Sequence, residues 1–153
     1  MNWKLIIGGG LAYYIAAFIV SMAGGTLIHE GILDEAYRAT TEYWRPELTE
    51  DPPDMTTLMP LWISTGVITA FILAGIYGVF RNALSGPGWQ RGLKFGVAVW
   101  LLNTSLMAAW SGVFNLPYEI WIWWAVDALI YVLVGSIVLG IVAEKLAPVQ
   151  PRE

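Results

Sequence analysis

Residues 120–143 read IWIWWAVDALIYVLVGSIVLGIVA, and this stretch decides the fold class. An α-helix rises 1.5 Å per residue, so about 20 apolar residues cross roughly 30 Å of hydrocarbon. Three further runs of similar length and character lie at 5–28, 58–80 and 95–118. Since 57% of the chain is hydrophobic, the sequence predicts an all-α polytopic membrane protein with a four-transmembrane-helix bundle.

The four predicted spans account for most of the chain, so we expect a single transmembrane domain over 1–153. The longest connection, 29–57, forms an outer cap in this scheme. Between Ile32 and Trp44, apolar residues recur at spacings near three and four, with acidic residues between them. This pattern predicts a short amphipathic extracytoplasmic helix that lies on the membrane or covers the bundle, and Pro46 is expected to end it.

Basic residues are divided unevenly between the two sides of the predicted membrane. Those near the termini and the second connection are Lys4, Arg81, Arg91, Lys94, Lys145 and Arg152. Only Arg38 and Arg45 lie in the outer cap, among eight acidic residues. The positive-inside rule therefore predicts that this multi-pass membrane protein has both termini in the cytoplasm.

Asp127 is the only Asp, Glu, Lys or Arg within the four runs. A carboxylate in the hydrocarbon costs about 2.5–3.5 kcal/mol on insertion scales, so by default such a residue marks a functional site. The alternative is a structural role, in which Asp127 accepts hydrogen bonds from neighbouring hydroxyls and fixes the helix register. The sequence leaves both interpretations open.

A group of polar and aromatic residues is predicted to lie near the depth of Asp127. Counting from the outer ends of the spans gives Ser64, Thr65 and Ser111 at a similar depth, with His29 at the mouth and Trp124 one turn away. Together with Asp127 they are the predicted ligand-binding residues, which would line a polar vestibule beneath the cap. The nine tryptophans also fit a simpler interpretation, because indole rings favour the membrane–water interface.

Several classes of function find no support in the sequence. The chain has no cysteine and a single histidine, so thiol catalysis is excluded and neither a metal site nor haem is expected. It contains no nucleophile–base pair, phosphate-binding loop or dinucleotide fingerprint, so we predict no catalytic residues, no cofactor and no enzymatic activity. Nothing in the chain resembles a basic nucleic-acid surface.

The order of short motifs resembles small four-span bacterial integral membrane proteins of uncharacterised function. These motifs are Met1-Asn2-x-Lys4, Tyr77-Gly78-x-x-Arg81, Trp89-x-x-Gly92-Leu93-Lys94-x-Gly96 and Trp124-x-x-Asp127. The resemblance implies four spans and a longer polar outer segment. It implies no activity and assigns no role to any residue.

Two functions therefore remain in view. The first is a non-enzymatic ligand-binding or accessory membrane protein, which holds a small hydrophobic or lipid-like ligand, or a partner membrane subunit, near Asp127. The second is a small oligomeric transporter or proton-coupled carrier that uses Asp127. Ser136 and Gly140 form a small-xxx-small pair, which serves either packing within the chain or a homo-oligomer.

Overall fold

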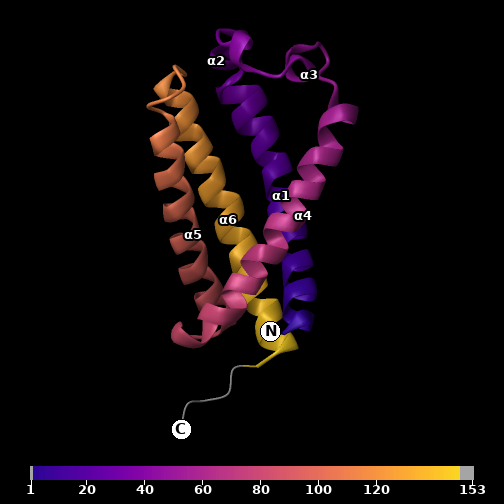
Figure 1. Cartoon of the computed structure of the whole chain (residues 1–153), viewed down its shortest axis with the longest axis vertical. Coiled ribbons are helices and arrows are strands. Elements are labelled where there is room, and N and C mark those ends of the chain that lie inside the picture. The colour runs from indigo at the N-terminus through magenta and orange to yellow at the C-terminus, as the bar shows by residue number, and fades with distance from the viewer. Residues whose placement is uncertain (1, 149–153) are drawn as a thin grey trace.

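The computed structural model describes residues 2–148, and within that range the chain is helical and contains no strand (Figure 1). Four helices in this part of the chain are long and apolar enough to cross a membrane. They are Leu5–Ile32, Met55–Ala83, Gly88–Trp110 and Tyr118–Leu146. The predicted all-α fold with four spanning helices is confirmed. Met1 of the amino-terminal motif and Arg152 of the basic set lie outside the described residues.

The first spanning helix is built from three segments. They are η1 (Leu5–Gly9), α1 (Gly10–Gly24) and η2 (Gly25–Ile32), of which η1 and η2 are π-helical. At the end of η2, the Leu33 amide donates to the Ile28 carbonyl at 2.8 Å, five residues back. This wider turn continues the helix four residues beyond the predicted end at residue 28. Segments of π-helix are rare, and they occur frequently at functional sites.

The segment after the first helix holds three short helical turns, and the first of them is a short helix within the predicted range 32–44. These turns are α2 (Asp34–Arg38), η3 (Thr41–Tyr43) and α3 (Pro46–Thr49). The Thr40 hydroxyl donates to the Ala36 carbonyl at 2.7 Å, and such a bond competes with the backbone ladder of a helix. Pro46 begins α3 rather than ending a helix, because the first helical position needs no amide donor.

The second spanning helix comprises α4 (Met55–Phe80) and the short turn η4 (Arg81–Ala83). It starts three residues before the predicted start at residue 58. Asp54 caps it by accepting from the amides of Thr56 and Thr57 at 3.0 and 3.3 Å. These bonds satisfy donors that have no partner in the first turn of a helix.

The third and fourth spanning helices are α5 (Gly88–Trp110) and α6 (Tyr118–Leu146). Helix α5 lies nearer the amino terminus than the predicted span at 95–118. Its first two turns carry polar residues, so the apolar run in the sequence begins later than the helix does. The start is fixed by Pro87 and by the Gly88 amide, which donates to the Glu144 carboxylate at 2.6 Å.

Helix α6 lies between α5 and α1, and α4 packs on α1. Close approach of α5 and α6 depends on glycine: a β-carbon on Gly92 would collide with the Ser136 carbonyl, and one on Gly140 with the Gly88 carbonyl. Both Ser136 and Gly140 are buried within the chain. Their small-xxx-small pair therefore serves packing of α5 and is not free for contact with a second copy.

The helices converge at one end and diverge at the other (Figure 1). We call the first the terminal end, because it carries the amino terminus and the last turn of α6, and the second the cap end, because it carries α2, η3 and α3. At the terminal end, Tyr77 and Phe95 meet edge to face at 5.3 Å, and Arg81 Nη1 donates to the Ala147 carbonyl at 2.6 Å. The main hydrophobic core lies in this half.

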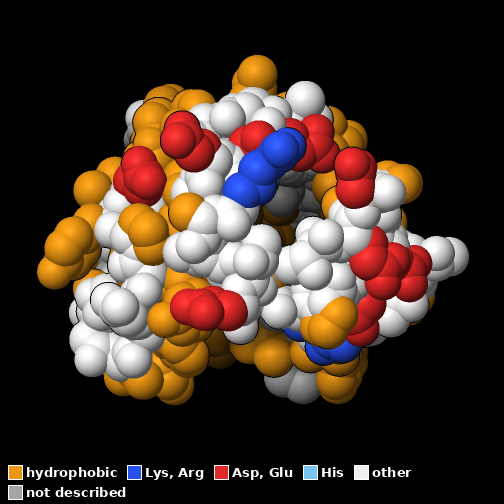
Figure 2. Space-filling view, turned by 90° about the horizontal axis from the view of Figure 1, so that it is seen from above, with side chains coloured by type: hydrophobic (Ala, Val, Ile, Leu, Met, Phe, Trp, Pro, Cys, Tyr) orange, Lys and Arg blue, Asp and Glu red, His pale blue; other side chains and the backbone are white. Residues whose placement is uncertain are grey.

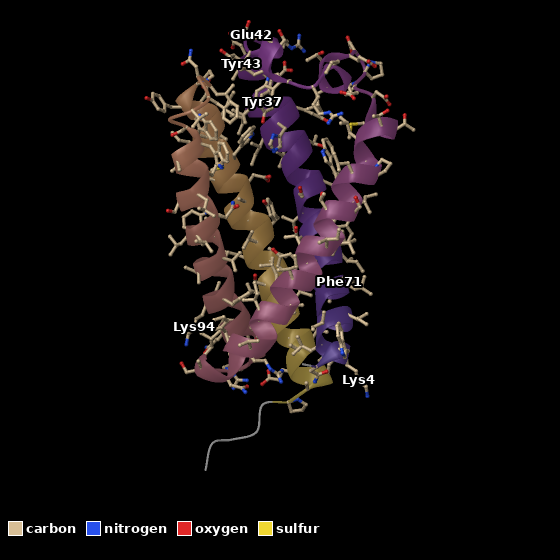
Figure 3. The ribbon with its side chains drawn as sticks, in the orientation of Figure 1. Lys4, Tyr37, Glu42, Tyr43, Phe71 and Lys94 are labelled. Atoms are coloured by element: carbon tan, nitrogen blue, oxygen red, sulfur yellow. The ribbon has the colours of Figure 1, made fainter. Side chains whose placement is uncertain are left out.

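Charge also differs between the two ends. Figure 3 shows Lys4 and Lys94 at the terminal end, and Glu42 at the cap end beside Tyr37 and Tyr43. A second, smaller apolar cluster lies under the cap, where Leu33 and Ala36 are buried against Ile120. The divergent cap end is thus closed by its own small core, separate from the main one.

Candidate functional site

Four side chains from three elements meet at the cap end in a connected series. His29 lies on η2, Tyr37 on α2, and Trp124 and Asp127 on α6. The Trp124 indole donates to the Tyr37 hydroxyl at 2.6 Å, and that oxygen lies 2.6 Å from His29 Nδ1. His29 Nε2 in turn lies 3.5 Å from Asp127 Oδ2. The series thus connects the cap to the carboxylate within α6.

The chemistry of the indole sets the direction of these hydrogen bonds. An indole nitrogen can only donate, so the Tyr37 oxygen accepts from Trp124 and its own proton remains available for His29 Nδ1. In neutral His29 the proton then sits on Nε2, where it faces the Asp127 carboxylate. The opposite tautomer would turn a nitrogen lone pair toward carboxylate oxygens. Protonated His29 would form an ion pair with Asp127 over the same distance.

Tyr37 remains a neutral phenol whether His29 is neutral or protonated. It lies outside the spanning helices and is half-buried. Burial raises its pKa, and the nearby charge of Asp127 adds to this, while the hydrogen bond from Trp124 acts in the opposite direction. The Tyr37 hydroxyl therefore keeps its proton at neutral pH and can donate a hydrogen bond to His29 Nδ1.

Asp127 is buried, with only 7% of its surface exposed. Its Oδ1 atom lies against Gly24 of α1, where any β-carbon would collide with it. Within the described chain its carboxylate has one hydrogen-bond contact, the long one to His29. A carboxylate has about four acceptor positions, and buried acceptors are normally filled. The capacity of Asp127 is therefore largely unused by the protein.

Aromatic side chains fasten the cap to the start of α6. Trp44 donates from its indole to the Tyr37 carbonyl at 3.2 Å and to the Thr40 hydroxyl at 3.1 Å. Its ring meets those of Tyr37 and Trp124 at centroid distances of 5.2 and 6.0 Å, both edge to face. Such contacts hold the cap segment in one position over α6.

Two adjoining cavities open beside this series, and we refer to them together as the cap-end pocket. The larger has a volume of about 590 Å³ and the smaller about 290 Å³. The larger is lined by Tyr43, Trp44, Asn103, Leu106, Met107, Trp110, Phe114, Leu116, Trp121 and Trp124. The smaller is lined by His29, Asn103, Met107, Trp124, Asp127, Ala128 and Tyr131. Since Asn103, Met107 and Trp124 line both, the aromatic part leads to the carboxylate.

The structure brings together three of the six predicted site residues, namely His29, Trp124 and Asp127. The hydroxyls of the other three do not join them. Ser64 and Thr65 are exposed on α4, and both donate to the Leu61 carbonyl, at 3.0 and 2.8 Å. Ser111 donates to the Ala108 carbonyl at 2.7 Å. Ser64 and Thr65 lie about as far into α4 as Asp127 lies into α6, but they point in another direction around the helix axis. Ser111 was placed at the wrong depth, because α5 ends at Trp110 and Ser111 lies at that end.

Two residues of the site were absent from the predicted set. Tyr37 connects Trp124 to His29, and in the sequence it is one of the residues that make up the apolar pattern between Ile32 and Trp44. Asn103 lines both parts of the pocket from α5. An amide within an apolar span is a signal of the same kind as Asp127, so Asn103 could have been found from sequence.

The polar groups gathered at this site can form hydrogen bonds with a ligand and can exchange protons. Within residues 2–148, no group of three or more metal-ligating side chains lies close enough together to hold an ion. A comparison of the chain with protein-family models, curated proteins and solved structures finds no match. The roles of the site residues therefore rest on their geometry and chemistry.

Proposed function

We propose that this chain is a ligand-binding membrane protein that holds one small hydrophobic molecule in the cap-end pocket. The observation that carries the proposal is the continuity of an aromatic cavity of about 590 Å³ with a second cavity lined by Asp127. Ligand sites commonly have about 300–1,000 Å³, mostly apolar walls and a few polar groups that fix orientation. The pocket has each of these features.

The arrangement of the helices supports the same conclusion. The helices are held together by the core of the terminal half, and they separate toward the cap end (Figure 1). Tyr37 and Trp44 meet α6 at Trp124, through a hydrogen bond and a ring contact, outside the main core. A ligand can therefore enter beside the cap without disrupting the main core.

Photolabelling tests the proposal. An eight-carbon alcohol carrying a diazirine would be irradiated with the protein in nanodiscs, and the labelled residues identified by mass spectrometry. We expect saturable labelling of α5 and α6 residues that line the pocket, with competition by unlabelled octanol. Met107→Trp fills the space shared by both cavities, so this variant should lose the saturable labelling. Leu102→Trp, on the exposed face of α5, should keep the saturable labelling. Labelling spread evenly over exposed residues would refute the proposal.

A second candidate, proton-coupled transport, is favoured by the hydrogen-bonded series from Tyr37 through His29 to Asp127. Such a series can pass a proton between the cap and the carboxylate. In liposomes with a trapped pH-sensitive dye and an imposed potential, this candidate requires proton uptake that Asp127→Asn abolishes. Equal rates for both proteins and for empty liposomes would exclude it.

The proposed orientation is a bacterial inner or plasma membrane with both termini and the connection after η4 in the cytoplasm, and the cap outside. It is supported by the gathering of basic residues at the terminal end (Figure 3). The chain lacks cysteine, so single cysteines can be placed freely. We expect a membrane-impermeant maleimide to label Glu42→Cys in intact cells, and Lys94→Cys only after lysis. The reverse pattern would overturn the orientation.

A further inference from the structure

The cap-end pocket carries information about the charge of its ligand. Asp127 presents a buried carboxylate whose one contact among described residues, at 3.5 Å, leaves most of its acceptor positions empty. In a water-poor site, a charged hydrogen-bond donor on the ligand would be the partner that compensates such a group best. An anionic ligand would instead meet repulsion.

The walls of the pocket are suited to a cation as well as to hydrocarbon. Six aromatic side chains line the larger cavity, and four of them are tryptophan. The face of an indole ring attracts organic cations more strongly than other aromatic rings do, and it also packs against alkyl groups. No lysine or arginine lines either cavity. The walls therefore offer a positive group several attractive surfaces and no basic neighbour.

The cap end of the molecule is acidic. Figure 2 looks onto this end, where acidic side chains are spread over the surface and a basic side chain lies among them. The exposed acids of the cap segment are Glu30, Glu35, Glu42, Glu50 and Asp51. The two arginines there are each bound to a neighbouring acid, Arg38 to Asp34 and Arg45 to Glu47, both at 3.0 Å. This surface raises the local concentration of cations and lowers that of anions.

From these three observations we infer that the ligand is a lipophilic organic cation, with its ammonium group at Asp127 and its hydrocarbon among the tryptophans of the larger cavity. The inference rests on the proposed function and adds the chemical class of the ligand. His29 lies beside the ligand cation in this arrangement, with its Nε2 atom 3.5 Å from Asp127 Oδ2. The cap contact through Tyr37 is retained.

Three diazirine probes of equal length test the inference: octylamine, octanol and octanoate derivatives in nanodiscs of zwitterionic lipid, with labelling normalised to that of the lipid. We expect the amine to saturate the pocket at a concentration about tenfold lower than the alcohol, since a charge-assisted hydrogen bond is stronger than a neutral one. The carboxylate should bind more weakly than both. These comparisons use the unaltered protein, so they do not depend on whether a variant folds.

Asp127→Asn then assigns the preference to one residue. In this variant we expect the amine and the alcohol to saturate the pocket at about the same concentration, with the alcohol still labelling it. Ser64→Ala, at a residue exposed on α4, is the matched control and should keep the full preference. Equal binding of amine and alcohol to the unaltered protein would overturn the inference alone, as would a preference that survives in Asp127→Asn. Absence of saturable labelling by all three probes would overturn the proposed function with it.

Discussion

Asp127 Oδ1 lies against Gly24, at the place where any other residue would carry its β-carbon. The contact joins α6 to α1 at the depth of the carboxylate, and it is possible only because Gly24 has no side chain. Helix association in membranes depends on such close approaches rather than on hydrophobicity. Gly24 therefore fixes the position of the one acidic residue among the apolar runs.

Gly24→Ala should destabilise the protein by about 1–3 kcal/mol, the usual cost of inserting a methyl group into a packed interior. The methyl group has to displace either the Asp127 side chain or the helix itself. The free energy of unfolding in mixed micelles, followed by circular dichroism, measures the effect. Gly25→Ala is a close control, because nothing lies within 4 Å of a β-carbon there. Equal stability of the two variants would refute this account of Gly24.

Gly92→Ala should cost about 3 kcal/mol, at the upper end of this range. Here the added carbon would meet the Ser136 carbonyl of α6, and backbone cannot move aside as a flexible side chain can. Gly75→Ala is the control within the spanning helices, since its nearest neighbour is Ile6 Cδ1 at 4.0 Å. The same unfolding measurement checks both. A loss for Gly92→Ala no larger than that for Gly75→Ala would contradict the assigned packing of α5 on α6.

The sequence predicts the number of spanning helices correctly, and it singles out Asp127 for a physical reason. A carboxylate in an apolar run is costly, so Asp127 is informative without any knowledge of its neighbours. Depth along a helix can also be counted, which is how His29 and Trp124 were correctly grouped with it. Both predictions use one dimension, the position along the helix axis.

Rotation about that axis could not be predicted in the same way. Helix α4 is apolar on all sides, so its sequence does not indicate which face meets α1, and Ser64 and Thr65 were placed in the site on depth alone. Tyr37 was missed because the cap is a series of short turns rather than a regular helix. Its contact with Trp124 joins residues 87 positions apart. No local pattern encodes such a pair.

Tyr37→Phe should change the tautomer of His29. The variant removes the hydroxyl that donates to Nδ1, while the aromatic ring remains. We expect the ring nitrogens in the unaltered protein to report a proton on Nε2, and the variant to show a mixture of both tautomers. Because the chain has one histidine, nitrogen NMR of histidine-labelled protein needs no assignment. Tyr43→Phe, at an exposed tyrosine of η3, is the control. An unchanged spectrum in Tyr37→Phe would refute the proposed direction of the hydrogen bonds.

Asp54 gives the start of α4 a dependence on pH. Hydrogen bonds from the side chains of Thr56 and Thr57 lower its pKa from the ordinary 3.8, with smaller contributions from their amides. A carboxylate whose pKa is lowered by folding stabilises the folded state above its unfolded pKa. This contribution is lost as the pH falls below about 3.8 and through the folded value.

The melting temperature of the unaltered protein should therefore fall between pH 6 and pH 3 by more than that of Asp54→Asn, which carries no titrating cap. Asp51→Asn is the matched control, because Asp51 is an exposed acid of the same connection and accepts no hydrogen bond within the described chain. We expect it to keep the pH dependence of the unaltered protein. If Asp54→Asn kept that dependence too, the acid sensitivity would have to come from another carboxylate, and the cap of α4 would contribute nothing to it.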